Sequence, residues 1–293
     1  MIEALRTPDE RFTGLPGFPY APHYFNRPDG LRLHYLDEGP ETAARTFLCL
    51  HGQPTWSYLY RRMIPIFTGA GHRVVAPDFL GFGRSDNPVD EAVYTFDFHR
   101  DTLLAFIEAL DLRNITLVVQ DWGGLIGLTL PMAAPDRYAA LLVMNTALGT
   151  GDEPLSEGFL AWRAFSNRNP DMDIARLMQR SCPHLGEAAA AYAAPFPDAT
   201  YKAGVRRFPN LVPDRPDAGG AALSRAARDF WRNDWTGKSL MAIGMKDPVP
   251  GPPVMRALHG IIKGCPPPLE IAEGGHFLQE WGEEIAAQAV RML

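Results

Sequence analysis

The stretch from Ile115 to Gly127 constrains the fold of this chain more than any other. Five β-branched or apolar residues lead through Gln120 to one carboxylate, Asp121, and an apolar helical pattern follows Gly123 and Gly124. A short apolar run that ends at a turn is typical of a buried parallel strand, and the new spacing after the glycines indicates a helix. We therefore predict a sharp strand-turn-helix with Asp121 at its apex.

This shape is that of a nucleophile elbow, in which a strained turn lifts one side chain above the end of a sheet. Asp121 occupies the position that usually holds Ser, and Val119 stands where the usual motif begins with Gly. An Asp is ionised at pH 7, so it can attack carbon without a base and form an ester. Asp121 is also a good N-cap for the following helix, and the two roles are compatible because a helix N-terminus favours negative charge.

Strand-like and helix-like segments alternate on both sides of this stretch, which predicts an α/β protein with a mostly parallel, doubly wound sheet. From 151 to 235 the pattern changes to short helical segments rich in Pro, Arg and aromatic residues, so we predict a helical cap inserted between core segments 1–150 and 236–293. The expected elements are a hairpin (23–25 and 31–36), strands at 47–50, 73–76, 115–119, 141–145, 239–244 and 269–271, and helices at 56–67, 96–110 and 277–293, with Pro65 ending or bending the first helix.

The composition is that of an ordinary globular enzyme of 293 residues with a net charge of −6, which does not favour nucleic acid or an anionic membrane as partner. The N-terminus lacks the apolar core of a signal peptide, and no apolar run is long enough to span a bilayer. Cys49, Cys182 and Cys265 are odd in number and far apart, which argues against a disulfide framework or a zinc site. We expect a cytoplasmic location.

Three polar residues follow predicted strands in the order Asp121, Asp247 and His276. The carboxyl ends of parallel strands meet at one edge of a sheet, which is where such sheets bind their ligands. Taken singly, Asp247 is an ordinary turn residue before a proline, and His276 is an ordinary loop histidine. Nucleophile, acid and His in this order, however, is the chain order of α/β-hydrolase triads, so we predict a catalytic triad.

At this point the sequence resembles the haloalkane dehalogenases along nearly its whole length. The match is to the subfamily whose triad acid follows the seventh strand of the α/β-hydrolase fold and whose second halide-binding Trp lies in the cap. Leu125 replaces an aromatic residue of the relatives, and Gln53 replaces Glu or Asn. The segments that carry the resemblance are His51–Trp56, Val119–Gly124, Gly244–Asp247, Gly275–Phe277, Tyr192–Pro197 and Gly204–Pro209.

The resemblance implies hydrolysis of a carbon–halogen bond to an alcohol, a halide and a proton. Asp121 would displace the halide, His276 would activate water against the ester, and Asp247 would orient the imidazole. The indole N–H groups of Trp122 and Trp162 would hold the halide, because they are donors with no acceptor to repel an anion.

Backbone N–H groups of Gln53 and Trp122 would hold the oxyanion in the same mechanism. The apolar substrate pocket would include Phe159, Phe208, Pro209 and Val212. The implied partners are a small haloalkane, water and halide, without a metal or an organic cofactor, and the expected assembly is a monomer.

Epoxide hydrolase is the nearest alternative, because it shares the fold, the Asp nucleophile and the ester. It requires two cap tyrosines, for which Tyr192 and Tyr201 are candidates. Fluoroacetate dehalogenase would need an Arg soon after the nucleophile, and residues 125–130 contain none. A Ser esterase is disfavoured by Asp121. From a different class, a non-catalytic binding protein of the same fold would bind ligand without turnover.

Overall fold

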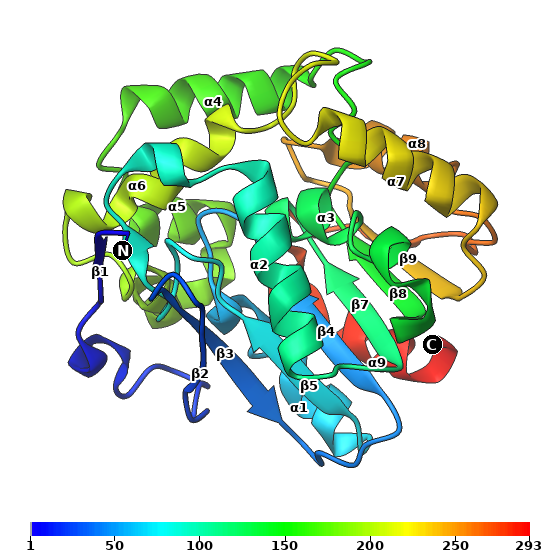
Figure 1. The fold of residues 1–293 in the computed structure, drawn as a ribbon, viewed down its shortest axis with the longest axis horizontal. Coiled ribbons are helices and arrows are strands. Elements are labelled where there is room, and N and C mark those ends of the chain that lie inside the picture. Colours follow the sequence, from blue (N-terminus) through cyan, green and yellow to red (C-terminus); the bar gives the residue numbers. More distant parts are fainter. Residues whose placement is uncertain (1) are drawn as a thin grey trace.

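An eight-stranded sheet lies at the centre of the computed structural model, which describes residues 2–293 (Figure 1). Its strand order is β10-β9-β8-β7-β4-β5-β3-β2, and all neighbours from β10 to β5 are parallel, whereas β3 and β2 join antiparallel. The strands are β2 (His23–Asn26), β3 (Arg32–Glu38), β4 (Thr46–Leu50), β5 (Arg73–Pro77), β7 (Ile115–Val119), β8 (Tyr138–Met144), β9 (Lys238–Gly244) and β10 (Leu269–Ile271); β1 (Ala4–Leu5) pairs separately with β6 (Asn87–Pro88). The predicted mostly parallel, doubly wound sheet is confirmed.

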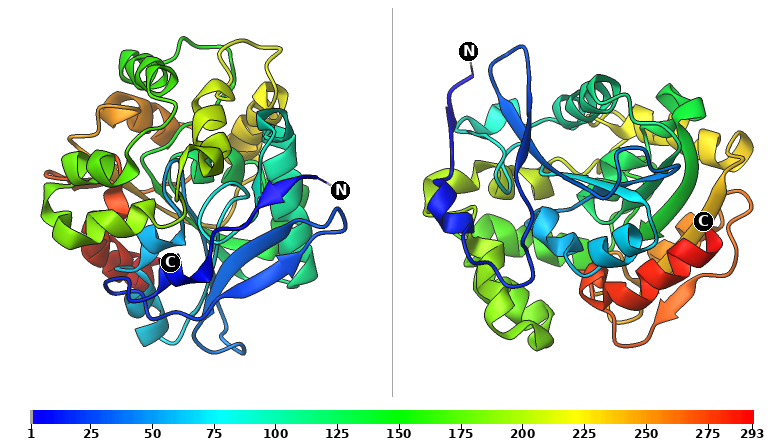
Figure 2. Two further views of the ribbon diagram at one scale, coloured as in Figure 1. Left: turned by 90° about the vertical axis from the view of Figure 1, so that its left-hand side faces the viewer. Right: turned by 90° about the horizontal axis from the view of Figure 1, so that it is seen from below.

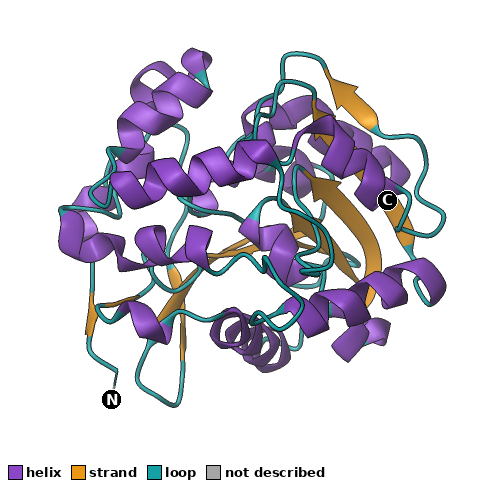
Figure 3. Ribbon diagram, turned by 90° about the horizontal axis from the view of Figure 1, so that it is seen from above, coloured by secondary structure: helices purple, strands orange, loops and turns teal. Residues whose placement is uncertain are grey.

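Helices cover both faces of this sheet (Figures 2 and 3). One face is covered by α1 and α9, and the other by α2, α3 and α7 (Figure 2). The α-helices are α1 (Ile64–Gly69), α2 (Phe96–Ala109), α3 (Trp122–Gly127), α4 (Glu157–Arg168), α5 (Ile174–Ser181), α6 (Ala203–Arg207), α7 (Ala221–Asn233), α8 (Gly251–His259) and α9 (Gly282–Met292). The 3-10 helices are η1 (Asp9–Phe12), η2 (Ser57–Tyr60), η3 (Glu91–Val93), η4 (Pro131–Ala133), η5 (Pro135–Arg137), η6 (Pro183–Ala193), η7 (Ala199–Lys202), η8 (Phe208–Asn210) and η9 (Leu278–Trp281). No helix in the described range is long and apolar enough to cross a bilayer.

Two segments that were each predicted to form one helix divide into a 3-10 helix and an α-helix. The segment 56–67 divides into η2 and α1, and Pro65 lies in the first turn of α1, where its missing N–H would have no helical acceptor. The expectation that Pro65 ends or bends a helix is therefore wrong, because a helix begins at Ile64, immediately before this proline. The C-terminal segment 277–293 likewise divides into η9 and α9.

The segment predicted as a cap divides between two places. Helices α4, α5 and α6 gather on one side of the molecule, whereas α7 lies beside α3 and β8 (Figure 1). The buried Trp231 of α7 donates from its indole to the carbonyl of Leu128 at 2.8 Å. A parallel crossover from β8 to β9 requires such a helix on the sheet. We therefore propose that the cap ends before α7, at about 220, and that α7 belongs to the core layer.

A buried ion cluster joins the cap to the core. Both guanidinium Nη atoms of Arg61 donate to the Glu280 carboxylate, at 2.6 and 2.8 Å, and the Tyr192 hydroxyl of η6 donates to the same carboxylate. All three side chains are buried. The cluster thus ties η2, η6 and η9 together, although these segments are far apart in the sequence.

Replacing Glu280 with Gln should lower the free energy of unfolding by about 3–5 kcal/mol, because Arg61 would then remain buried without a full counter-charge. Urea denaturation measures the change. The control is Glu283→Gln, which removes a 68% exposed partner of Arg62 and should cost at most about 0.5 kcal/mol. Equal effects of the two changes would contradict a stabilising role for the buried cluster.

Candidate active site

The predicted strand-turn-helix is present, with Asp121 at its apex. Asp121 has φ 50° and ψ −124°, a conformation that a non-glycine residue adopts only when its surroundings impose it. Its N–H donates to the Asn145 carbonyl at 3.0 Å, and its own carbonyl accepts from Leu125 N at 2.9 Å and Thr146 Oγ1 at 2.7 Å. The carboxylate makes no capping hydrogen bond to α3. The turn therefore leaves the side chain free to face other groups.

Glycines make room for this turn. A Cβ on Gly52 would lie 2.2 Å from Asp121 Oδ1, a Cβ on Gly123 would lie 2.0 Å from the Leu50 carbonyl oxygen, and one on Gly124 would lie 2.1 Å from Thr146 Oγ1. None of these distances is compatible with a side chain. The glycines that follow Asp121 in the sequence are thus explained by close packing of the elbow against β4 and the end of β8.

The predicted triad residues come together at the carboxyl ends of β7, β9 and β10. His276 Nδ1 lies 3.0 Å from Asp247 Oδ2, and His276 Nε2 lies 3.4 Å from Asp121 Oδ2. Asp247 Oδ1 accepts from Val249 N at 2.7 Å, and the Asp247 side chain is fully buried. The imidazole thus bridges two carboxylates, one of which is anchored by the backbone.

These charges set the protonation state of the imidazole. Burial lowers the pKa of His276, but the charges of Asp247 and Asp121 and their hydrogen bonds outweigh it and raise the pKa to about 10. At neutral pH the resting site therefore holds an imidazolium between two carboxylates. Loss of either charge lowers this pKa and moves the imidazole toward the neutral base.

Replacing Asp121 with Asn should move the pKa of His276 down from about 10, because one of its two neighbouring charges is removed. NMR titration of the His276 ring measures the shift, and Asp101→Asn, on the exposed side of α2, is the matched control that should leave it unchanged. In the wild type the stabilisation from this group is complete below its unfolded pKa of about 6.5 and is lost as pH rises through about 10. An unchanged titration in the Asp121→Asn variant would refute the charge coupling.

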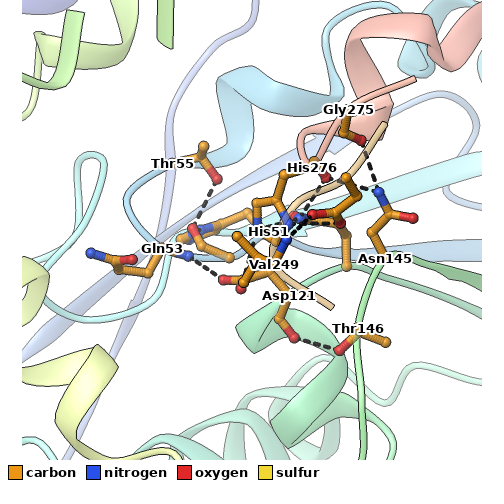
Figure 4. Close-up of polar contacts among 12 residues, drawn as sticks. His51, Gln53, Thr55, Asp121, Asn145, Thr146, Val249, Gly275 and His276 are labelled. Carbon is orange, nitrogen blue, oxygen red and sulfur yellow. Dashed lines mark hydrogen bonds and ion pairs between the residues drawn. The ribbon is translucent and has the colours of Figure 1, made fainter. Parts of the chain in front are cut away.

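The loop that follows β4 binds one oxygen of the Asp121 carboxylate through a backbone N–H group. Gln53 N donates to Asp121 Oδ1 at 2.8 Å, as the predicted oxyanion donor should (Figure 4). The Gln53 side chain points away and donates to the Val205 carbonyl of the cap at 3.0 Å. Trp122, the second predicted donor, begins α3, so the helix does not use its N–H.

The neighbouring His51 is a neutral ring. Burial lowers the pKa of His51, and its Nδ1 donates to the Gly52 carbonyl at 2.9 Å.

Two residues that support the triad were missing from the sequence-based prediction. Gln120 donates to the His276 carbonyl at 3.0 Å, and its amide nitrogen lies 3.3 Å from His276 Nε2. Asn145 donates to the Gly275 carbonyl at 2.8 Å and accepts from Gly244 N at 2.9 Å. Both residues directly follow a strand, β7 or β8, and this position is the signal that could have identified them.

The predicted halide-binding tryptophans differ in their surroundings. Trp122 is only 2% exposed, and its indole N–H donates to no acceptor in residues 2–293. By contrast, the buried Trp56, Trp231 and Trp235 donate to Ala191 O, Leu128 O and Ser239 Oγ. Trp162 is half-buried on α4 and pairs with Phe165, and no aromatic pair among the described residues joins it to Trp122. Trp122 thus has a free donor beside the nucleophile, whereas the geometry gives Trp162 less support.

A cavity of about 420 Å³ opens beside Asp121. Of the predicted pocket residues, Phe159 and Val212 line it, together with Leu125 and Pro213. Phe208 and Pro209 are buried but are not part of this lining. The Phe208 ring instead packs against Trp122, with ring centroids 4.7 Å apart, and against Phe82 and His99. Phe208 therefore packs on Trp122, a position that sequence spacing does not distinguish from the cavity wall.

The two tyrosines considered for epoxide opening lie elsewhere. The Tyr192 hydroxyl is engaged with Glu280 and Arg61 in the buried cluster, and Tyr201 borders a separate surface hollow beside Arg6. No tyrosine lines the cavity at Asp121 within the part of the chain that is described. Nor does any group of three His, Cys, Asp or Glu side chains in residues 2–293 have the arrangement of a metal site.

Known proteins similar to this chain share both its sequence and its fold. The family model of the alpha/beta hydrolase fold matches residues 45–283. Haloalkane dehalogenase of Psychrobacter cryohalolentis is 45% identical over 100% of this chain and 98% of the relative, and that of Mycolicibacterium paratuberculosis is 40% identical over 97% and 96%. The tetrameric structure of haloalkane dehalogenase DpaA from Paraglaciecola agarilytica superimposes with a TM-score of 0.97 at 52% identity, over 100% of this chain and 99% of that one.

Proposed function

The chain belongs to the haloalkane dehalogenases of the α/β-hydrolase fold, and we propose that Asp121 is the nucleophile of their reaction. It is a hydrolase that acts on carbon–halide bonds. The observation that carries the proposal is the position of the Asp121 carboxylate, which is aimed at an apolar cavity with Gln53 N on one oxygen and His276 near the other.

In the first step, Asp121 attacks the halogenated carbon of the substrate. Gln53 N–H holds Oδ1, which leaves Oδ2 to form the new carbon–oxygen bond. The carbon–halogen bond breaks in line with the attack, and the halide departs with its electron pair. A negative charge in an apolar cavity is costly unless donors meet it, and the free indole N–H of Trp122 supplies one. Trp162 is proposed as the second donor on the family resemblance.

In the second step, His276 activates water against the ester. Ester formation removes the charge of Asp121, so the pKa of His276 falls from the raised value that both carboxylates support. The neutral imidazole then takes a proton from water as the water oxygen attacks Cγ of Asp121. Asp247 stabilises the imidazolium, and the N–H groups of Gln53 and Trp122 hold the oxyanion. The bond between Cγ and Oδ2 then breaks, the imidazolium returns its proton to the departing oxygen to give the alcohol, and the second proton of the water leaves the carboxyl group to solvent, which restores the carboxylate.

The rival functions have less support. Epoxide hydrolysis lacks a tyrosine on the cavity wall in the described residues. A binding protein without activity would have no need for an imidazole held at 3.0 Å from a buried carboxylate and 3.4 Å from a second one. The proposed partners are therefore a small haloalkane and water, with halide as product.

We propose that one chain is the catalytic unit, because Asp121, Asp247 and His276 all come from it. The related enzyme from Paraglaciecola agarilytica is described as tetrameric, so the expected monomer requires a light-scattering measurement. A cytoplasmic location is proposed on the three cysteines, each of which is a free thiol here.

Asp121→Ala should lower halide release from 1-bromobutane and 1,2-dibromoethane by on the order of 10³-fold or more, because the nucleophile is lost. His276→Ala should still form the ester but not hydrolyse it, so mass spectrometry should find one butyl group on the peptide that contains Asp121. Asp101→Ala, on the exposed side of α2, is the matched control. Diol formation from styrene oxide without halide release from the bromides would instead assign an epoxide hydrolase.

Trp122→Phe should lower kcat/KM for bromoalkanes by about 10- to 100-fold, since it keeps an aromatic ring but removes one donor to a charged leaving group. Halide release kinetics measure the loss, and weaker product inhibition by bromide should accompany it. Trp281→Phe is a control on η9, a segment separate from α3 and from the elbow at Asp121. Unchanged bromide inhibition in the Trp122→Phe variant would place the halide site elsewhere.

A further inference from the structure

The volume of the cavity at Asp121 exceeds that of a small haloalkane. The lining of the cavity includes residues of α7, α8 and the segment 146–156, which precedes α4. Val254, Leu258 and Ile261 contribute apolar side chains to this lining, and Arg228 and Arg232 of α7 also belong to it. One continuous space thus connects the nucleophile to two guanidinium groups.

The arginines at this far end retain donors without partners. Arg228 Nη1 pairs with Asp152 at 2.9 Å, and its buried Nε makes no hydrogen bond among the described residues, although Asp229 Oδ1 lies 3.7 Å from it. Arg232 is exposed and forms no ion pair within residues 2–293. Glu153 also lines this end and is exposed, so it can turn toward solvent. The remaining charges nearby, Asp229 and Arg225, face Arg228 and Asp152.

The size of the cavity defines what could reach these donors. At about 30 Å³ per water-sized group, 420 Å³ holds on the order of a dozen non-hydrogen atoms. A molecule of about that size, with its halogenated carbon at Asp121, would occupy the same cavity that Arg232 lines. A carboxylate is the terminal group that best matches unpaired guanidinium donors.

We propose that the enzyme binds ω-halogenated alkanoates, with the halogen at Asp121 and the carboxylate at Arg232 and Arg228. The inference rests on the proposed function and names the substrate class of that same site. It differs from α-halo acid hydrolysis, because the carboxylate lies at the end of the chain remote from the halogen. An arginine next to the nucleophile, which residues 125–130 lack, is therefore not required.

The test compares two substrates that differ only at the remote end, 10-bromodecanoate and 10-bromodecan-1-ol. Wild-type enzyme should show a kcat/KM about fivefold higher for the carboxylate, through a lower KM, and added salt should reduce only this advantage. Arg232→Gln should abolish the advantage and leave the alcohol unchanged. Arg291→Gln, an exposed arginine on α9 outside the cavity, should leave both substrates unchanged.

In a series of ω-bromoalkanoates with six, eight and ten carbons, the advantage over the matching alcohol should depend on chain length, because only one range of lengths places the carboxylate at Arg232. Equal kcat/KM for acid and alcohol at every length, with no effect of Arg232→Gln, would overturn the proposal while the dehalogenase function stands. Failure of wild-type enzyme to release bromide from 10-bromodecan-1-ol and 1-bromobutane would instead remove the proposed function itself.

Discussion

The site depends on one backbone residue that is held in an unfavourable conformation. Asp121 has a positive φ because the elbow packs so closely on β4 and β8 that only glycines fit around it. This turn aims the carboxylate away from α3 and toward Gln53 N and His276. The sheet then completes the arrangement, since the parallel strands β7, β9 and β10 end at the same edge. Local strain and global topology thus specify one geometry together.

The protonation state of His276 should change during the proposed reaction, because it depends on the charges of Asp247 and Asp121. In the resting enzyme His276 is held protonated, mainly by Asp247 and Asp121. An imidazolium cannot serve as a base. In the proposed mechanism the ester removes one of the two charges, so the base becomes available only after the first step is complete. The order of the chemistry is thereby built into the electrostatics of three side chains.

Sequence patterns predicted the sheet, the elbow and the triad because these follow from periodicity and from the order of strand ends. They failed where the answer depends on contacts between distant segments. The Gln53 side chain binds Val205, Phe208 supports Trp122 instead of lining the cavity, and α7 packs on the core layer. Pro65 was assigned to a helix end because its place within the helix was unknown. Most of these contacts depend on the position of the cap relative to the core, which no local sequence pattern specifies.

The buried Arg61–Glu280–Tyr192 cluster has a consequence for how a substrate could enter. Lifting the cap as a rigid lid would separate Tyr192 from a buried carboxylate and would leave polar groups without partners. Substrate entry therefore has to leave the contact of Tyr192 with Glu280 intact, and the cap and the core should unfold together in one transition.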